Sequence, residues 1–286
     1  MIRKILPRDF RAISHLETSD LMKNHPDGIQ FDVARPNVVV GPNGAGKSAL
    51  IGALALYSLS HFSWRSSLDR HYLGEDKFWA EGGWWRDMSE FLPGIGCDGD
   101  MAPALYYRPG HIPGNDDSVT AAMMCGYFEL AKEYGRQTDK RSSGQGCLAR
   151  LDAIRAFLRG EEGEAKLAEY ALDDWRAGRA PKKMGACGSR YELRAEVLKA
   201  RAAAGAKALA GGARPVVLMD EPEQSLDALA ETRLWRELSA CADRCPAQVI
   251  IATHSLYPIM RPERFNLIEA VPGYIELVRT EMGLAP

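Results

Sequence analysis

One run of eight residues constrains the fold of this 286-residue chain more than any other feature of its sequence. Gly41-Pro-Asn-Gly-Ala-Gly-Lys47-Ser48 fits the pattern G-x-x-x-x-G-K-[ST]. A short apolar stretch at 37–40 precedes it, and a helix-forming stretch at 49–59 follows it. A glycine-rich turn that happens to precede Lys-Ser is the alternative, but it accounts for neither neighbour. The pattern therefore predicts a phosphate-binding loop between a strand and a helix.

The residue types in this loop match the chemistry of a phosphate group. Glycines let the backbone curl so that successive N–H groups point at phosphate oxygens, and the following helix directs its positive end at the same anion. We expect Lys47 to reach the β- and γ-phosphates and the Ser48 hydroxyl to bind Mg²⁺. The predicted nucleotide-binding residues are Asn43, Gly44, Ala45, Gly46, Lys47, Ser48 and Ala49.

Composition and charge narrow the classes to which the chain can belong. The apolar share is 46%, the charged share 26% and the formal net charge −2, so bulk charge does not favour nucleic acid or membrane surfaces, and only a local patch would bind them. No apolar run approaches the length of a membrane span, and the N-terminus lacks a signal-peptide pattern. We therefore expect a cytoplasmic protein whose six cysteines are reduced thiols.

Short apolar runs alternate with helical patterns, which predicts an α/β fold with a mostly parallel central sheet, an N-terminal antiparallel β part and a helical subdomain. A turn is expected at 26–28. The expected strands are 10–17, 29–34, 37–40, 104–107, 216–219, 248–252, 265–270 and 274–278. The expected helices are 49–59, 118–134, 148–158, 165–175, 191–209 and 226–241.

A second motif supplies the acidic groups that a phosphate site needs. Val216-Val-Leu-Met-Asp220-Glu221 is an apolar strand that ends in two carboxylates. Asp220 would hold Mg²⁺, directly or through water, and Glu221 would act as the general base on the attacking water. An ordinary acidic turn between strand and helix is the alternative, and the phosphate-binding loop favours the functional interpretation. The adjacent Asp-Glu pair resembles that of ABC-type P-loop ATPases.

Three further stretches extend this resemblance in the order that the family has. Arg141-Ser-Ser-Gly-Gln145 is similar to the signature loop, and the resemblance implies that Ser142, Ser143, Gly144 and Gln145 contact the γ-phosphate held by a second subunit. Asp227 lies at the end of Ser225-Leu226-Asp227, where the family has its D-loop, although this stretch also suits a helix N-cap followed by an ordinary first turn. His254 ends an apolar strand like the switch histidine of the family, which would keep the water and Glu221 in register.

Details of these motifs resemble the SMC/RecF/OLD-like branch of the family. Asp220-Glu-Pro-Glu223 is followed by Leu226, Ala252-Thr-His-Ser255 ends the later strand, and Asp9-Phe-Arg11 lies near the start. The resemblance implies a stand-alone ATPase head that binds ATP and Mg²⁺ and closes as a homodimer over two nucleotides. It departs from the family in having Arg141 in place of leucine and in lacking a glutamine between Ser48 and Gln137.

The domain organisation that we expect is a single head over 1–286. It contains a loop-rich insertion at 61–116 and a helical subdomain at 117–210, with an extra insertion at 160–190. By analogy with this branch, the chain is expected to be a regulatory subunit with a protein effector partner in antiphage defence or DNA maintenance, in which nucleic-acid binding is an open question. The alternatives are the nucleotide-binding subunit of a membrane transporter and an interaction protein that binds ATP without turnover.

Overall fold

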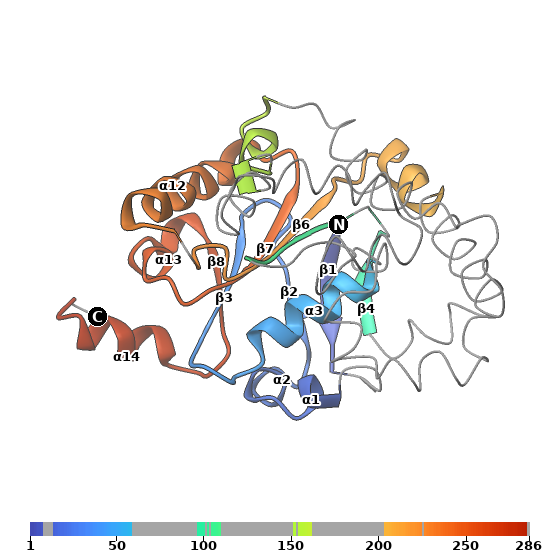
Figure 1. Ribbon diagram of the computed structural model, residues 1–286. Helices are drawn as coiled ribbons and strands as arrows, with labels where there is room; N and C mark the ends of the chain where they lie inside the picture. Colours follow the sequence, from blue (N-terminus) through green and yellow to red (C-terminus); the bar gives the residue numbers. More distant parts are fainter. Residues whose placement is uncertain are drawn as a thin grey trace, which may run out of the picture.

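The computed structural model describes residues 1–7, 14–58, 96–100, 102, 104–109, 151–152, 154–161, 203–224 and 226–284. Its central feature is a five-stranded sheet in which every neighbouring pair of strands runs parallel. This confirms the predicted α/β class with a parallel central sheet. In spatial order the strands are β5 (Ala104–Tyr107), β6 (Val216–Asp220), β7 (Gln248–Ala252), β3 (Asn37–Val40) and β8 (Asn266–Glu269) (Figure 1).

Helices pack on both faces of this sheet, so its inner strands are buried on both sides. Val39 and Leu218 face one way and belong to a core cluster with α3, whereas Val38 and Val217 face the other way and pack with α12 and α13. Each such side chain contributes about 1.5–3 kcal/mol when it is fully buried. The helices are α3 (Lys47–Tyr57), α12 (Ala228–Arg244) and α13 (Tyr257–Met260) (Figure 1).

A second, antiparallel sheet forms the N-terminal β part that the sequence predicts. Its order is β2-β1-β4, with β1 at Ile2–Leu6, β2 at Ile29–Gln30 and β4 at Gly96–Gly99. The buried Gln248 joins it to the parallel sheet, because its side-chain amide accepts from the Ile2 N–H and donates to the Ile2 carbonyl, each at 2.7 Å. This buried amide therefore ties the two sheets together.

Two predicted strands near the N-terminus are wrong over part of their length. Residues 14–17 of the expected strand 10–17 form the short helix α1 (Ser14–Glu17), which is followed by α2 (Asp20–Asn24). Of the expected strand 29–34, only the residues of β2 form a strand. Ser19 explains the helical path, since its hydroxyl accepts from the Met22 N–H at 3.3 Å and caps α2.

The last expected strand, at 274–278, is the helix α14 (Tyr274–Glu281). Glu269 at the end of β8 accepts from the backbone N–H groups of Gly273 and Ile275, at 3.2 and 2.6 Å, so it satisfies donors at the start of the helix. Tyr274, Ile275 and Val278 then pack against the core from one side. That spacing suits a helix better than a strand.

Other predicted elements agree closely with the structure. The bounds of β3, β5 and β7 match the predictions, and residues 151–152, 154–158 and 203–210 are helical as expected. A 3₁₀ turn, η4 (Pro262–Arg264), precedes β8. The expected helices 118–134 and 165–175, and most of the segments 61–116 and 160–190, lie outside the described residues. Among the residues that the structure describes, no helix has the length and apolar character of a membrane span.

Candidate functional site

The predicted phosphate-binding loop, the acidic pair and the histidine follow three neighbouring strands of the parallel sheet. The loop at 41–46 follows β3, Asp220 ends β6, and His254 comes two residues after β7, which lies between them. The register pairs Asp220 with Ala252 and Ala252 with Val39. Because carboxyl ends of parallel strands meet at one edge, the three motifs come together there, where ligands of open α/β sheets bind.

The loop is held against the N-terminal part of the chain on one side and open on the other. Leu21 donates its N–H to the carbonyl of the buried Ala45 at 3.0 Å. Gly46 has φ +101°, and a Cβ there would lie 2.5 Å from the Cβ of Ser19. Gly44 has φ +79° and faces open space. The glycines thus serve two different needs, a close approach at Gly46 and a left-handed backbone at the exposed Gly44.

Lys47 lies inside its own loop. Its Nζ donates to the carbonyls of Gly41 and Pro42 at 2.8 and 2.9 Å, and the residue is only 5% exposed. Burial lowers the pKa of the Lys47 ammonium, whereas the charges of Glu221, Asp220 and, less strongly, a third carboxylate oppose that change. The loop therefore encloses a cation at the start of α3, close to the acidic end of β6.

Asp220 is a buried carboxylate with one oxygen unused. Its Oδ1 has no hydrogen-bond partner, and its Oδ2 lies 3.5 Å from the Nε of Arg108. Burial raises the pKa of Asp220, while a hydrogen bond from Ser48 and the Arg108 charge lower it. A buried orphan carboxylate oxygen costs about 1–3 kcal/mol unless a ligand takes it up.

The unused Asp220 oxygen and the Ser48 hydroxyl form a donor set that fits Mg²⁺. This ion prefers oxygen ligands, and it is often held by one or two protein groups together with substrate phosphates. In the described part of the chain there is no cluster of three or more His, Cys, Asp or Glu side chains that would form a metal cage. The fit therefore requires oxygens from a bound phosphate and from water.

Glu221 has a backbone conformation that its neighbours impose. It is the one non-glycine residue with positive φ, at +47°, among those that the structure describes. Its N–H donates to the Ala252 carbonyl at 2.8 Å, and its Oε1 lies 3.5 Å from His254 Nε2. Burial, and then the Lys47 charge, lower the pKa of His254, against the opposing charge of Glu221. Left-handed non-glycine residues concentrate at functional sites, which supports a special role for Glu221.

Glu223 has a positioning role that the sequence did not reveal. Its Oε1 accepts from the Thr253 hydroxyl at 2.5 Å and from the His254 N–H at 3.1 Å, so it fixes the backbone that carries the histidine. Its other oxygen is buried without a partner, and burial raises the pKa of Glu223. The only signal in the sequence is an acid two residues after the Asp-Glu pair; Arg108 gives no such signal.

The predicted contacts of the remaining site residues with a second subunit stay predictions. Ser142, Ser143, Gly144 and Gln145 lie outside the described residues. Asp227 is exposed and accepts from the Ala230 N–H at 2.8 Å as the N-cap of α12, so its structural role is clear and its D-loop role stays a prediction.

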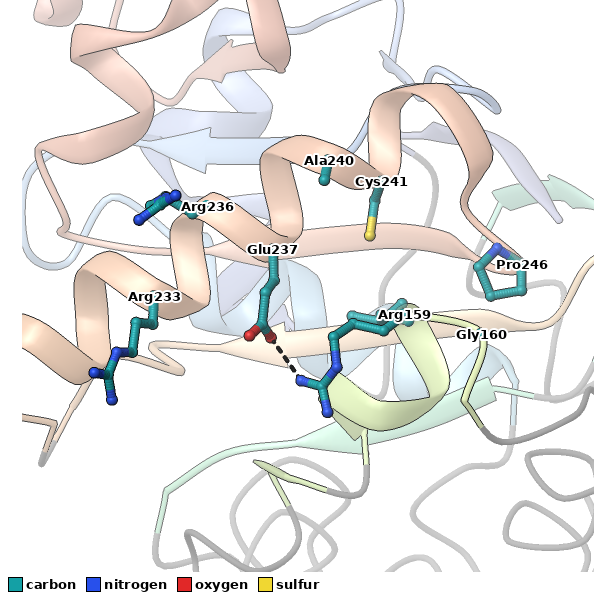
Figure 2. Close-up of a pocket in the computed structure, with 9 residues that line it drawn as sticks. Arg159, Gly160, Arg233, Arg236, Glu237, Ala240, Cys241 and Pro246 are labelled. Atoms are coloured by element: carbon teal, nitrogen blue, oxygen red, sulfur yellow. Dashed lines mark hydrogen bonds and ion pairs between the residues drawn. The ribbon is translucent and has the colours of Figure 1, made fainter.

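A separate pocket of about 600 Å³ lies along α12 (Figure 2). Arg159 reaches across it to Glu237, and none of the predicted site residues lines it. Arg233 and Arg236 contribute further positive charge from the same helix. The pocket is thus distinct from the edge where the phosphate-binding loop and Asp220 meet.

No model of a protein family matches the sequence, and a search of curated proteins gives no match either.

Proposed function

We propose that this chain binds and hydrolyses Mg-ATP, and that it acts as an ABC-type P-loop ATPase of the SMC/RecF/OLD-like branch. One observation supports this above all. A loop-enclosed lysine, a buried carboxylate with an unused oxygen and a Glu–His pair meet at one edge of a parallel sheet. Together they provide a phosphate cradle, a metal ligand and a general base.

Each residue has a distinct part in the proposed reaction. The N–H groups of residues 43–49 and the positive end of α3 hold the phosphates, and Lys47 moves from the loop carbonyls to phosphate oxygens. Mg²⁺, held by Ser48 and Asp220, would neutralise charge on the phosphates. Glu221 accepts a proton from the attacking water, and His254, oriented by Glu223, keeps that carboxylate in place.

Binding and turnover of ATP by matched variants test this proposal. The wild type should bind ATP in fluorescence titrations and release phosphate, with turnover that is slow or dependent on a partner. Lys47→Ala should weaken binding by roughly tenfold or more, because a buried cation on the phosphates is lost. Glu221→Gln should keep binding and lower hydrolysis by about 10²–10⁴-fold. If the wild type does not bind ATP, or if Lys47→Ala binds as tightly as the wild type does, the proposal is wrong.

The proposed biological role is that of a cytoplasmic regulatory subunit which passes its nucleotide state to a protein effector in antiphage defence or DNA maintenance. It rests on the likeness of the Asp220–Glu223 and Thr253–Ser255 stretches to that branch. A pull-down with Glu221→Gln and ATP, compared with Lys47→Ala, would identify an effector that binds only the loaded form. Equal capture by the two variants would contradict a nucleotide-controlled partner.

A further inference from the structure

Arg108 lies beside the acidic end of β6 because of the order of strands. β5 and β6 are parallel neighbours, and their register pairs Tyr107 with Met219, so the next residues, Arg108 and Asp220, fall side by side. The Nε of Arg108 is 3.5 Å from Oδ2 of Asp220. The Asp220 side chain is 2% exposed and that of Arg108 is 44% exposed, so the arginine reaches the buried carboxylate from the open side of the sheet edge.

The two oxygens of Asp220 have different surroundings, which leaves one of them without a partner and able to bind a metal ion. Arg108 approaches Oδ2, whereas Oδ1 is buried without a partner. A Mg²⁺ ion that uses Oδ1 and the Ser48 hydroxyl therefore does not need to displace the guanidinium. The two cations would then use different oxygens of the same carboxylate.

Positive charges flank the acidic residues along the edge of the sheet. Lys47 follows β3 on one side, and Arg108 follows β5 on the other, with the ends of β7 and β6 between them. Strands lie about 4.8 Å apart, so Arg108 is one strand from Asp220 and Lys47 is two strands away on the opposite side. A phosphate chain that starts on the loop and extends toward the metal at Asp220 points its terminal group at Arg108.

We propose that Arg108 is a ligand of the terminal phosphate of the bound nucleotide and makes the site prefer a nucleoside triphosphate over a diphosphate. This inference rests on the proposed function and adds to it. A guanidinium offers several N–H donors in a planar fork, and the Nε of this one lies 3.5 Å from Asp220 Oδ2. A diphosphate bound on the loop would lack the group that Arg108 contacts.

The test compares ATP and ADP affinities in a background that does not hydrolyse ATP. Each nucleotide competes with a fluorescent ADP analogue in the presence of Mg²⁺, with Glu221→Gln as the parent. Adding Arg108→Met should weaken ATP binding by roughly 10- to 100-fold, as expected for loss of charge-assisted hydrogen bonds, and leave ADP binding nearly unchanged. Arg108→Lys should lose less ATP affinity, because it keeps the charge without the fork.

Arg236→Met is the matched control, since it removes an exposed arginine that lines the separate pocket along α12, and it should change neither affinity. If Arg108→Met does not fold, Arg108→Lys tests the proposal instead, because its loss of affinity must be confined to ATP. Equal losses for ATP and ADP, or no loss, would overturn the role of Arg108 alone. A parent that binds neither nucleotide would overturn the proposed function as well.

Discussion

At the scale of single residues, Gly44 and Gly46 of the phosphate-binding loop lie in different surroundings. Both have positive φ, at +79° for Gly44 and +101° for Gly46. Of the two, only Gly46 lies close to a neighbouring side chain, that of Ser19. The Ser19 hydroxyl is held in place because it donates to the Leu16 carbonyl at 2.6 Å and accepts from the Met22 N–H. Ser19 therefore cannot move aside without losing the cap of α2.

This contrast predicts different costs for the same substitution. Gly46→Ala should lower the free energy of unfolding by about 3 kcal/mol, because left-handed strain adds to the contact with Ser19. Gly44→Ala should cost only about 1 kcal/mol, since its added methyl group meets nothing. Urea denaturation of the two variants without nucleotide measures both values. Similar costs would contradict the close approach of Gly46 to Ser19.

A second prediction at this scale concerns acid pH. Because burial and Lys47 lower the pKa of His254, the folded protein binds this proton less readily than the unfolded chain does. Stability should therefore be lost as the pH falls through 6.5, the ordinary pKa of His254 in the unfolded chain. His254→Gln should remove this part of the loss, as seen in melting temperatures of the nucleotide-free protein between about pH 5 and 8.

Lys47→Met offers an independent check, because the Lys47 charge is the second cause of the lowered pKa of His254. This variant should reduce the acid sensitivity without removing it, since burial remains. If His254→Gln and the wild type lose stability in parallel below pH 6.5, another group causes the acid response.

At the scale of elements, the sequence predicts strands well where both faces are buried and poorly where one side chain decides the outcome. Apolar runs identify β3, β6 and β7, since every one of their residues is buried. The helix α14 could not be predicted in this way, because its start depends on Glu269, which lies on the preceding strand. A local pattern does not include such a partner.

The residues of the candidate site are likewise predictable only where the local sequence is enough to identify them. The spacing within each motif predicts Lys47, Asp220 and His254, because each motif adjoins its own apolar strand. Glu223 and Arg108 act through neighbouring strands, one toward the end of β7 and the other from the end of β5. Their roles depend on β6 lying between those strands, an order that becomes visible only in the folded sheet.

At the scale of the whole molecule, several of the described residues at the proposed catalytic edge are exposed. Pro42, Asn43 and Gly44 are exposed, and the side chains of Glu221 and His254 are 30% and 35% exposed. Exposed apolar side chains lie near in sequence, with Leu229 at 59% two residues after Asp227 and Leu256 at 44% two residues after His254. Catalysis of phosphoryl transfer benefits when water is excluded, so a second copy that covers this edge would complete the site.

The oligomeric state of Glu221→Gln, measured by light scattering with and without Mg-ATP, tests this arrangement. The variant should retain nucleotide, so its mass should shift from monomer to dimer only when ATP is present, because in the proposed dimer both subunits would contact the γ-phosphate. Ser142→Arg in the same background should abolish the shift if the predicted signature loop contacts the γ-phosphate of the other subunit.

The outcomes separate two questions: whether the chain forms a dimer, and whether ATP and the predicted signature loop hold that dimer together. A protein that is dimeric without ATP has an interface that does not need the nucleotide, and the exposed Leu229 and Leu256 then become the first positions to replace with charged residues. A protein that stays monomeric while binding ATP tightly contradicts the assignment of residues 142–145 and leaves the phosphate-binding edge intact. Only a shift that requires both ATP and Ser142 makes the γ-phosphate the link between two subunits, and hydrolysis by Glu221 the step that separates them.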